Sequence, residues 1–498
     1  MTIYPLLRVL LTAALLPLLD LRAESPQTAF SASSIFPARG ATSVLPDTRL
    51  SITFNQPVTV GSSGVIRIYD TADGTVVDTV DLAAATALKN ELRSASELST
   101  RDLPVQTKSI GGLDNFHYYP VTTSGHTATL YPRDGALAYG KTYAVTIDAG
   151  AFTSASGTAF TGVADRSSWT FSTAGSGPSP RSTKLTVSAD GTGDFCTVQG
   201  ALDFIPADNT TPILILLRDG TYFETVYFNG KNNLTLLGQS RAGVVIEYPN
   251  NNNFNKAPGT YHRSAFYANN VSGLTLANLT VRNSTPQKGS QAEAVILTGP
   301  AATAHNIITH ADLLSYQDTV QLNGQVYVAD SRIEGDVDFL WGSGPAFFQN
   351  CAIRMLRARG GYFTQIRNAE SHHGFVFVDC ALTAVPGSTD HVLARIDPAV
   401  FPHSEVVWIN CTMGDFIAPA GWKFDKTAPG PDIRFWEHQS IDAATGRPLD
   451  VSARHPASRQ LTHPADAATI ASYRTPANVL GGDWSPTLPA SVSSYLSR

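Results

Sequence analysis

The chain has 498 residues, a formal net charge of −6 and only 15% charged residues. This length exceeds the about 100–200 residues of a usual domain, so we expect two domains and a targeting segment, unless one part is a long repetitive fold. The small charge and the lack of any Lys or Arg run argue against nucleic acid or an anionic membrane surface as the main partner.

Residues 1–24 have the pattern of a secretory signal peptide. Arg8 precedes an apolar run over residues 9–19, and the small Ala23 comes before Glu24, which predicts cleavage near Ala23. The run is too short to span a bilayer comfortably. No Cys lies near the cleavage point, so the sequence gives no sign of a lipid anchor. We therefore predict a secreted or periplasmic protein without a membrane anchor, with a buried helix as the alternative interpretation.

Residues 25–173 alternate short β-rich runs with Gly, Asp and Pro turns, for example LSITFNQPV and KTYAVTIDAGAF. Such alternation is typical of an antiparallel β-sandwich. The opening FPARGATSVLPDTRLSITFNQPV and the closing WTFST resemble bacterial Ig-like domains. We find no acid or His cluster here, so we interpret the segment as a spacer or binding module. Residues 174–181 form a Gly/Ser/Pro-rich linker.

Residues 182–498 contain short apolar runs that recur with a common pattern, such as NNLTLLG, VADSRIEG and WINCTMGD. Irregular repeats of about 20–30 residues with one similar strand each predict stacked coils of a parallel β-helix. A sandwich or an α/β domain is the rival, but long amphipathic helical stretches are scarce. We align the repeats on these Asx residues: Asn278, Asp312, Asp330, Asn350, Asp379 and Asn410.

The four cysteines are Cys196, Cys351, Cys380 and Cys411, and no CxxC or neighbouring His indicates a zinc site. The last three occupy the same place in successive repeats. Because neighbouring strands lie about 4.8 Å apart, stacked cysteines are close enough for a bridge. We predict a Cys351–Cys380 disulfide, with free cysteines stacked in the core as the alternative.

Two carboxylates, Asp318 and Asp338, lie twenty residues apart in the stretch YQDTVQLNGQVYVADSRIEGDVDFLWG. Stacked coils can bring both onto one face. Two carboxylates that share a site cannot both ionise easily, so one becomes an acid and the other a base or nucleophile. An isolated pair of Asp residues in β-turn sequence is usually structural.

Several motifs in order make residues 182–490 resemble the pectin methylesterase family, carbohydrate esterase family 8. They are VSADGTGDFCTVQGALDFIP, DGTYFETV, NLTVRNS, SQAEAVIL, YQDT, GDVDFLWG, FFQNC, YFTQ, LARIDP, PAGW and GGDW. The resemblance implies an all-β protein, with a right-handed parallel β-helix after the small Ig-like β-sandwich. It also implies a secreted pectinesterase that removes methyl esters from polygalacturonate and releases methanol.

The same resemblance implies roles for five residues. Asp338 is expected to be the nucleophile and Asp318 the general acid and then base. Gln317 and Gln291 are expected to donate hydrogen bonds to the oxyanion. Arg395 is expected to keep Asp338 ionised and oriented and to contact substrate. No metal or other cofactor is expected.

Some positions depart from the family pattern. Gln321 and Asp397 stand where relatives commonly have aromatic residues that stack on sugars, so two platforms are missing. Trp341 replaces the usual Phe and is predicted to contact substrate, with a core role as the alternative. Ser331 replaces a common Cys, which favours pairing of Cys351 with Cys380.

Two other functions remain open from the sequence. A pectate lyase or polygalacturonase can use the same fold, although the acid clusters that these reactions need are not evident. A non-catalytic polysaccharide-binding relative is the third hypothesis. In each case the expected partner is pectin or homogalacturonan. Nothing in the sequence fixes the oligomeric state, and a monomer is the simpler expectation.

Overall fold

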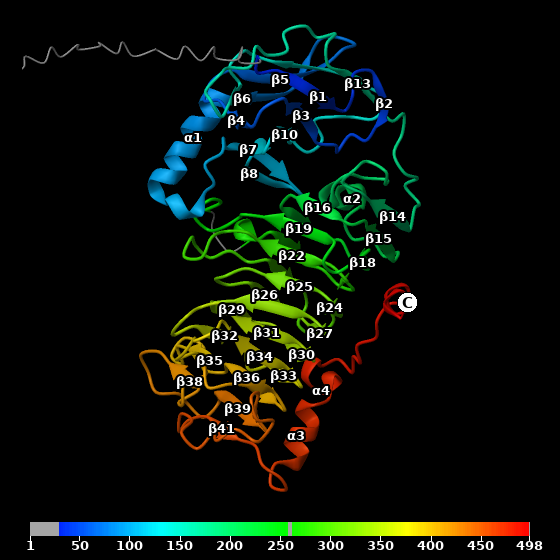
Figure 1. The fold of residues 1–498 in the computed structure, drawn as a ribbon. Helices are drawn as coiled ribbons and strands as arrows, with labels where there is room; N and C mark the ends of the chain where they lie inside the picture. Colours follow the sequence, from blue (N-terminus) through cyan, green and yellow to red (C-terminus); the bar gives the residue numbers. More distant parts are fainter. Residues whose placement is uncertain (1–28, 257–260, 498) are drawn as a thin grey trace, which may run out of the picture.

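A computed structural model describes residues 29–256 and 261–497. The predicted signal peptide, residues 1–24, lies outside the described residues. Two bodies follow one another along the chain, a β-sandwich and a long stack of parallel coils (Figure 1). No helix in the described part of the chain is long and apolar enough to cross a membrane.

The N-terminal body is a sandwich, as the alternation of its sequence predicts. Its inward side chains, including Phe54, Phe152 and Trp169, form a separate hydrophobic core. One sheet contains β1 (Ala32–Phe36), β3 (Leu50–Phe54), β10 (Thr127–Leu130) and β9 (Val121–Ser124). The other contains β2 (Ala41–Val44), β13 (Thr170–Thr173), β11 (Thr142–Ile147), β5 (Val65–Asp70) and β6 (Val76–Asp81), and β4 (Val58–Val60) pairs with β12 (Phe152–Ser154).

An insertion between β6 and β9 leaves the sandwich and reaches the coils. It consists of α1 (Leu82–Ala95), η1 (Glu97–Ser99) and the hairpin of β7 (Gln106–Ile110) and β8 (Leu113–Tyr118). Asp81 caps α1 by accepting hydrogen bonds from the backbone N–H groups of Ala83 and Ala84. Val105, Tyr118 and Tyr119 belong to the core of the second body rather than to that of the sandwich. Figure 1 shows the hairpin between the two bodies.

The second body is a parallel β-helix, which confirms the predicted fold class. The complete coils each contribute one strand to each of three parallel sheets, which have eleven, nine and eight strands. The sheet that carries the candidate site contains β17 (Val226–Asn229), β20 (Phe266–Asn269), β23 (Val295–Thr298), β26 (Val320–Asn323), β29 (Val337–Gly342), β32 (Tyr362–Ile366), β35 (Val392–Ile396) and β38 (Trp422–Phe424).

The other two sheets complete the coils. One contains β14 (Lys184–Val187), β15 (Ile213–Leu217), β18 (Leu234–Gly238), β21 (Thr275–Ala277), β24 (Asn306–Thr309), β27 (Val326–Ala329), β30 (Ala346–Gln349), β33 (Phe375–Val378), β36 (Glu405–Ile409), β39 (Arg434–His438) and β41 (Arg459–Gln460). The other contains β16 (Gly220–Phe223), β19 (Val244–Tyr248), β22 (Thr280–Asn283), β25 (Asp312–Leu314), β28 (Arg332–Gly335), β31 (Ala352–Met355), β34 (Ala381–Ala384), β37 (Thr412–Met413) and β40 (Ile441–Asp442).

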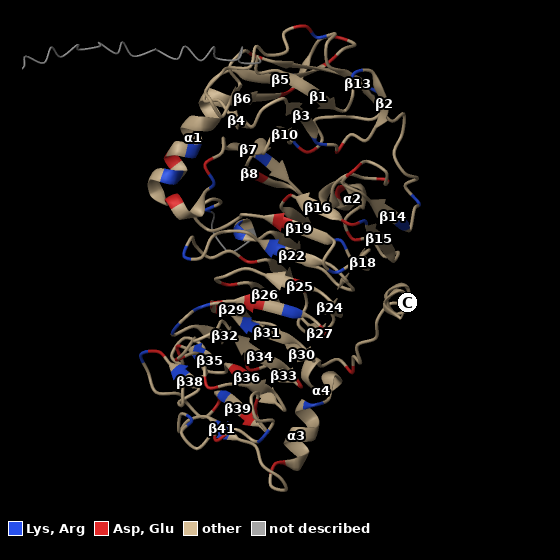
Figure 2. Ribbon diagram, in the orientation of Figure 1, with Lys and Arg blue, Asp and Glu red and all other residues tan. Residues whose placement is uncertain are grey.

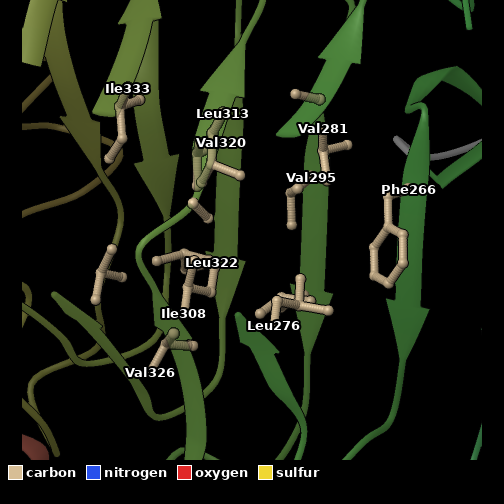
Figure 3. Close-up of a cluster of buried hydrophobic side chains, with 14 of the residues drawn as sticks. Phe266, Leu276, Val281, Val295, Ile308, Leu313, Val320, Leu322, Val326 and Ile333 are labelled. Atoms are coloured by element: carbon tan, nitrogen blue, oxygen red, sulfur yellow. The ribbon is translucent and has the colours of Figure 1, made fainter. Parts of the chain in front are cut away.

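The interior of the β-helix is filled by like side chains stacked from coil to coil. Figure 3 shows Val295, Val320 and Leu322 among these buried residues. Phe377 stacks on Trp408 with ring centroids 3.9 Å apart. Because successive strand residues point to opposite faces, each inward residue has outward neighbours on either side. The packing therefore fixes which residues can face a substrate.

The turns after one strand of each coil use a left-handed residue. Asn278, Asp330, Asn350, Asp379 and Asn410 all have φ between 50° and 55°, a conformation that Asn and Asp tolerate better than most residues. The sequence alignment of Asp312 with these residues is wrong. His310, with φ 51°, takes the turn position, while Asp312 lies in β25 and its carboxylate binds Arg241 and Arg332.

The predicted Cys351–Cys380 disulfide is not formed, and all four cysteines are free and buried. The Sγ of Cys351 donates to the Val328 carbonyl at 3.6 Å, and the Sγ of Cys380 donates to the Phe348 carbonyl at 3.7 Å. The stacked thiols thus bond to the backbone of the preceding coil. The alternative interpretation, free core cysteines, is the correct one.

Short helices cover one end and one side of the β-helix. α2 (Val198–Phe204) packs at the first coil, and Thr197 caps it. The C-terminal helices α3 (Ala467–Tyr473) and α4 (Pro476–Leu480) pack against outward residues of β30, β33 and β36, while α5 (Ala490–Leu496) packs against Leu237 and Ala277. The three C-terminal helices lie on a different sheet from the candidate site.

Candidate active site

Asp318 and Asp338 come from consecutive coils. Asp318 lies in the turn just before β26, and Asp338 lies in β29. The two strands pair in parallel, with Val320 opposite Leu340, and a further bridge joins Gln317 to Val337. Both acids are buried and adopt positive φ, 64° and 47°. The coil stacking therefore brings the two carboxylates to one face of one sheet.

Asp338 is held by a guanidinium group. Arg395, in β35, donates its Nε to Asp338 Oδ1 at 2.8 Å and its Nη2 to Asp338 Oδ2. Gln365 Nε2, from β32, donates to the same Oδ2 at 3.2 Å. Burial raises the pKa of Asp338, and Arg395 opposes that rise. The fork geometry fixes the carboxylate in one orientation.

Asp318 lies in a different electrostatic environment. Arg263, from the short η2 helix (Tyr261–Arg263), donates to Asp318 Oδ2 at 2.9 Å and also binds both oxygens of Glu293. Burial raises the pKa of Asp318 well above its usual range, and the negative charges of Glu293 and Asp338 add to that effect. Asp318 is therefore the acid of the pair that holds its proton more strongly.

Gln317 and Gln291 lie in neighbouring coils beside the acids. The backbone N–H of Ala292 donates to the Gln317 carbonyl at 3.1 Å, which ties the two segments together. The side-chain oxygen of Gln291 accepts a hydrogen bond from Ser290. Neither side-chain amide N–H group donates to any of the described residues, which leaves these donors able to bind an oxyanion.

Trp341 and Tyr362 are two aromatic side chains near Asp338. Trp341 is buried and faces the guanidinium of Arg367, 4.7 Å from the ring centroid. The Arg395 guanidinium lies 4.3 Å from the ring centroid of Tyr362, and Lys423 donates to the Tyr362 hydroxyl. Tyr362 is partly exposed. An aromatic ring is therefore present near Arg395 although the usual sequence positions lack one.

The two departures from the family pattern lie in different places. Gln321 is buried in β26, opposite Trp341 of the next strand. Asp397 lies just after β35, where its carboxylate accepts a hydrogen bond from the backbone of Ala399 and pairs with Lys426 at 3.2 Å. The charge of Asp397 is thus balanced by a lysine that follows β38 in the next coil.

Sequence reasoning missed four polar residues around the acids. Arg263 and Gln365 bond to the two acids, while Glu293 and Arg367 bond to Arg263 and Gln365. Glu293 could have been found, because a carboxylate inside the apolar run AEAVIL is a costly residue unless it is paired. Gln365 belongs to the YFTQ motif but had no assigned partner. Arg263 carries no local signal, since it lies in the short η2 helix, 55 residues from Asp318 in the chain. Acidic and basic residues are interspersed along this body (Figure 2).

Comparison with known proteins gives consistent results for both bodies. The pectinesterase family model matches residues 184–460, and a bacterial Ig-like domain model matches residues 26–173. Pectinesterase 31 of Arabidopsis thaliana is 31% identical over 246 residues, which are 47% of this chain and 75% of the relative. Probable pectinesterase 56 of the same plant is 32% identical. The aligned part makes up 84% of that relative and 48% of this chain.

Solved structures resemble the β-helix. Pectin methylesterase PemA from Erwinia chrysanthemi has 26% identity and a TM-score of 0.50. The superposed part covers 61% of this chain and 98% of the PemA chain. A pectin methylesterase in complex with hexasaccharide VII has 27% identity and a TM-score of 0.51, with the same shares of the two chains covered. The family model alone spans more than half of the 498 residues. The chain therefore belongs to the pectinesterase family.

Proposed function

We propose that the protein is a carboxylic ester hydrolase that removes methyl esters from the galacturonate units of pectin. The observation that carries this proposal is the pair of buried acids with unequal surroundings. Asp338 is bound by Arg395, and Asp318 lies beside the buried Glu293. Ester hydrolysis with a carboxylate nucleophile and a carboxyl general acid needs the first group ionised and the second protonated.

In the first step, Asp338 attacks the ester carbonyl carbon and the bond to the methoxy oxygen breaks. The proton of Asp318 passes to that oxygen, and methanol leaves. Gln317 and Gln291 donate hydrogen bonds to the oxyanion that forms, a contribution of about 3–4 kcal/mol for a good donor. In the second step, Asp318 takes a proton from water, and the hydroxide attacks the acyl carbon and frees Asp338. The products are methanol and a galacturonate carboxyl group.

The substrate assignment draws on the relatives. The solved structure with hexasaccharide VII carries the name pectin methylesterase, and the plant relatives carry the name pectinesterase. Trp341, Tyr362 and Arg395 are the residues we assign to contact with the sugar. The signal-like pattern of residues 1–24 supports action outside the cytoplasm.

The test is a product analysis. Purified protein is incubated with highly methylated pectin, and methanol, new reducing ends and unsaturated ends are measured together. Methanol without chain cleavage is the expected result. Chain cleavage without methanol would replace the esterase by a lyase or galacturonase, and binding without any product would leave a polysaccharide-binding protein.

A further inference from the structure

One continuous line of outward side chains runs along the sheet that carries the acids, and we call it the outward row. Strand register places Ile296 opposite Gln321, Gln321 opposite Trp341, and Trp341 opposite Gln365. Val295, Leu297, Val320 and Leu322 alternate with these residues and fill the core. The complete outward row is Tyr227, Tyr267, Ile296, Gln321, Trp341, Gln365, Arg395 and Lys423.

The hairpin β7–β8 covers the first three members of the outward row. Ile110 and Phe116 form a hydrophobic cluster with Tyr227, Tyr267 and Ile296. Although Ile296 faces away from the β-helix core, it is only 1% exposed, and so is Phe116. A hydrophobic contact of this kind excludes a sugar chain from these three strands.

The tip of the hairpin is fitted closely to the sheet. Gly111 has φ +52°, and a Cβ atom at this position would lie 2.3 Å from the carbonyl oxygen of Tyr227. Only glycine permits such an approach in this backbone conformation. The backbone N–H of His117 also donates to Asn255 at 2.7 Å. The hairpin is thus seated on the sheet by backbone as well as side-chain contacts.

The same insertion contacts the loop that carries Gln291. Ser99 Oγ donates to the carbonyl of Gly289. Asn251 Nδ2, in the loop after β19, donates to the carbonyl of Ser99 at 2.7 Å. Arg101 Nη2 donates to Ser284 Oγ at 3.0 Å. The loop between β22 and β23 is therefore held from outside by the N-terminal body.

The other end of the outward row is open. The side chain of Arg395 is 26% exposed and that of Lys423 is 44% exposed. Strands β32, β35 and β38 extend roughly 14 Å beyond β29 at about 4.8 Å per strand. On the hairpin side, only β26 lies between β29 and β23, the first strand that the hairpin covers. A sugar chain that reacts at Asp338 has room for several units on one side and for about one on the other.

We propose that the hairpin β7–β8 closes one end of the sugar-binding face, so that the enzyme removes methyl esters close to one end of a galacturonan chain. This inference rests on the proposed esterase function. The open side presents Arg395 and Lys423, whose charges suit the carboxylates of an acidic polysaccharide. The N-terminal body is then a specificity-determining part of the enzyme rather than a spacer.

The test uses a fully methylated galacturonate hexamer with an isotopic label at its reducing end. Fragmentation mass spectrometry at early times identifies which sugar loses its methyl group first. For the full chain, we expect release from the two units at one end to be at least fivefold faster than release from the central units. Equal rates at all positions would overturn the proposal.

A hairpin variant makes the test specific. Gln106 pairs with Tyr118, so residues 107–117 can be replaced by an Asn-Gly turn that joins these two positions. We expect the central units to gain at least fivefold relative to the terminal ones, with unfolding checked by circular dichroism. Asp114→Asn, an exposed change at the hairpin, is the matched control and should keep the wild-type pattern.

The outcomes separate the two proposals. A folded hairpin variant with an unchanged positional pattern overturns the role of the hairpin but leaves the esterase function intact. If the hairpin variant does not fold, the full chain still tests the proposal, because equal rates of methanol release at all positions of the hexamer would overturn it. Failure of the full chain to release methanol from the hexamer and from pectin overturns the esterase function itself.

Discussion

Glu293 faces Asp318 across a single guanidinium group, that of Arg263. Arg263 binds both oxygens of the fully buried Glu293 and one oxygen of Asp318. One positive charge thus serves two carboxylates, and the negative charge of Glu293 raises the pKa of Asp318. In the proposed mechanism Glu293 is a positioning residue, because it acts on the reaction only through Asp318.

Glu293→Gln should move the alkaline side of the pH–activity profile to lower pH. In the proposed mechanism Asp318 gives its proton to the departing methanol, so activity is expected to be lost as the pH rises through its pKa. Removing the charge of Glu293 lowers that pKa, and the loss then begins at lower pH. The measurement is methanol release against pH at saturating pectin. Glu334→Gln, which removes an outer carboxylate paired with Arg332 and Arg354, is the control. An unchanged alkaline side would contradict the role of Glu293.

The fold and the pairing of the two acids were predictable because the strand pattern repeats along the sequence. Strands of similar pattern at Asp330, Asn350 and Asn410 predict stacked coils, and a spacing of one coil places Asp318 and Asp338 together. Asp312 was misaligned because sequence alone cannot separate a turn Asx from one inside a strand. Arg263 and the hairpin contacts of Phe116 were not predictable, since they join segments far apart in the chain and depend on how the two bodies pack.

Asp338→Asn should reduce methanol release by at least a thousandfold while the protein stays folded. The amide cannot act as the nucleophile, but it is isosteric with the carboxylate. The matched control is Asp330→Asn, because Asn already occupies the equivalent turn at positions 350 and 410. We expect this control to keep wild-type activity. The assay is methanol release with circular dichroism on both variants, and activity within tenfold of wild type would remove Asp338 from the nucleophile role.

Arg395→Lys should lower activity more at acid pH than at neutral pH. Lysine keeps a positive charge but cannot form the two parallel hydrogen bonds that Arg395 makes to Asp338. The pKa of Asp338 then rises further, so the ionised nucleophile is lost at higher pH than in the wild type. The acid side of the pH profile of kcat reports this change. Arg395→Ala should also destabilise the fold, by about 3–5 kcal/mol, because it leaves the buried carboxylate unpaired.

Reducing agents should not change the stability of the protein. Cys351 and Cys380 are free thiols in consecutive coils, 29 residues apart in the chain. A disulfide closing such a loop would contribute on the order of 3 kcal/mol. Urea unfolding with and without dithiothreitol checks this directly, together with thiol titration of the unfolded chain. Four titratable thiols and equal unfolding midpoints are expected. Two titratable thiols and a midpoint that falls on reduction would show instead that a disulfide is present.

Phe116→Ala should destabilise the β-helix although Phe116 belongs to the N-terminal body. Its ring is buried against Tyr227 and Ile296 and makes an edge contact with His262. Loss of a buried phenylalanine costs about 3–5 kcal/mol. Phe36→Ala is the matched control, because Phe36 is 43% exposed and its removal should change stability little. Urea unfolding followed by tryptophan fluorescence reports chiefly on the β-helix, which contains Trp341, Trp408 and Trp422. A lower midpoint for Phe116→Ala alone means that the hairpin stabilises the coils it covers, while equal midpoints for the two variants would mean that it contributes nothing to them.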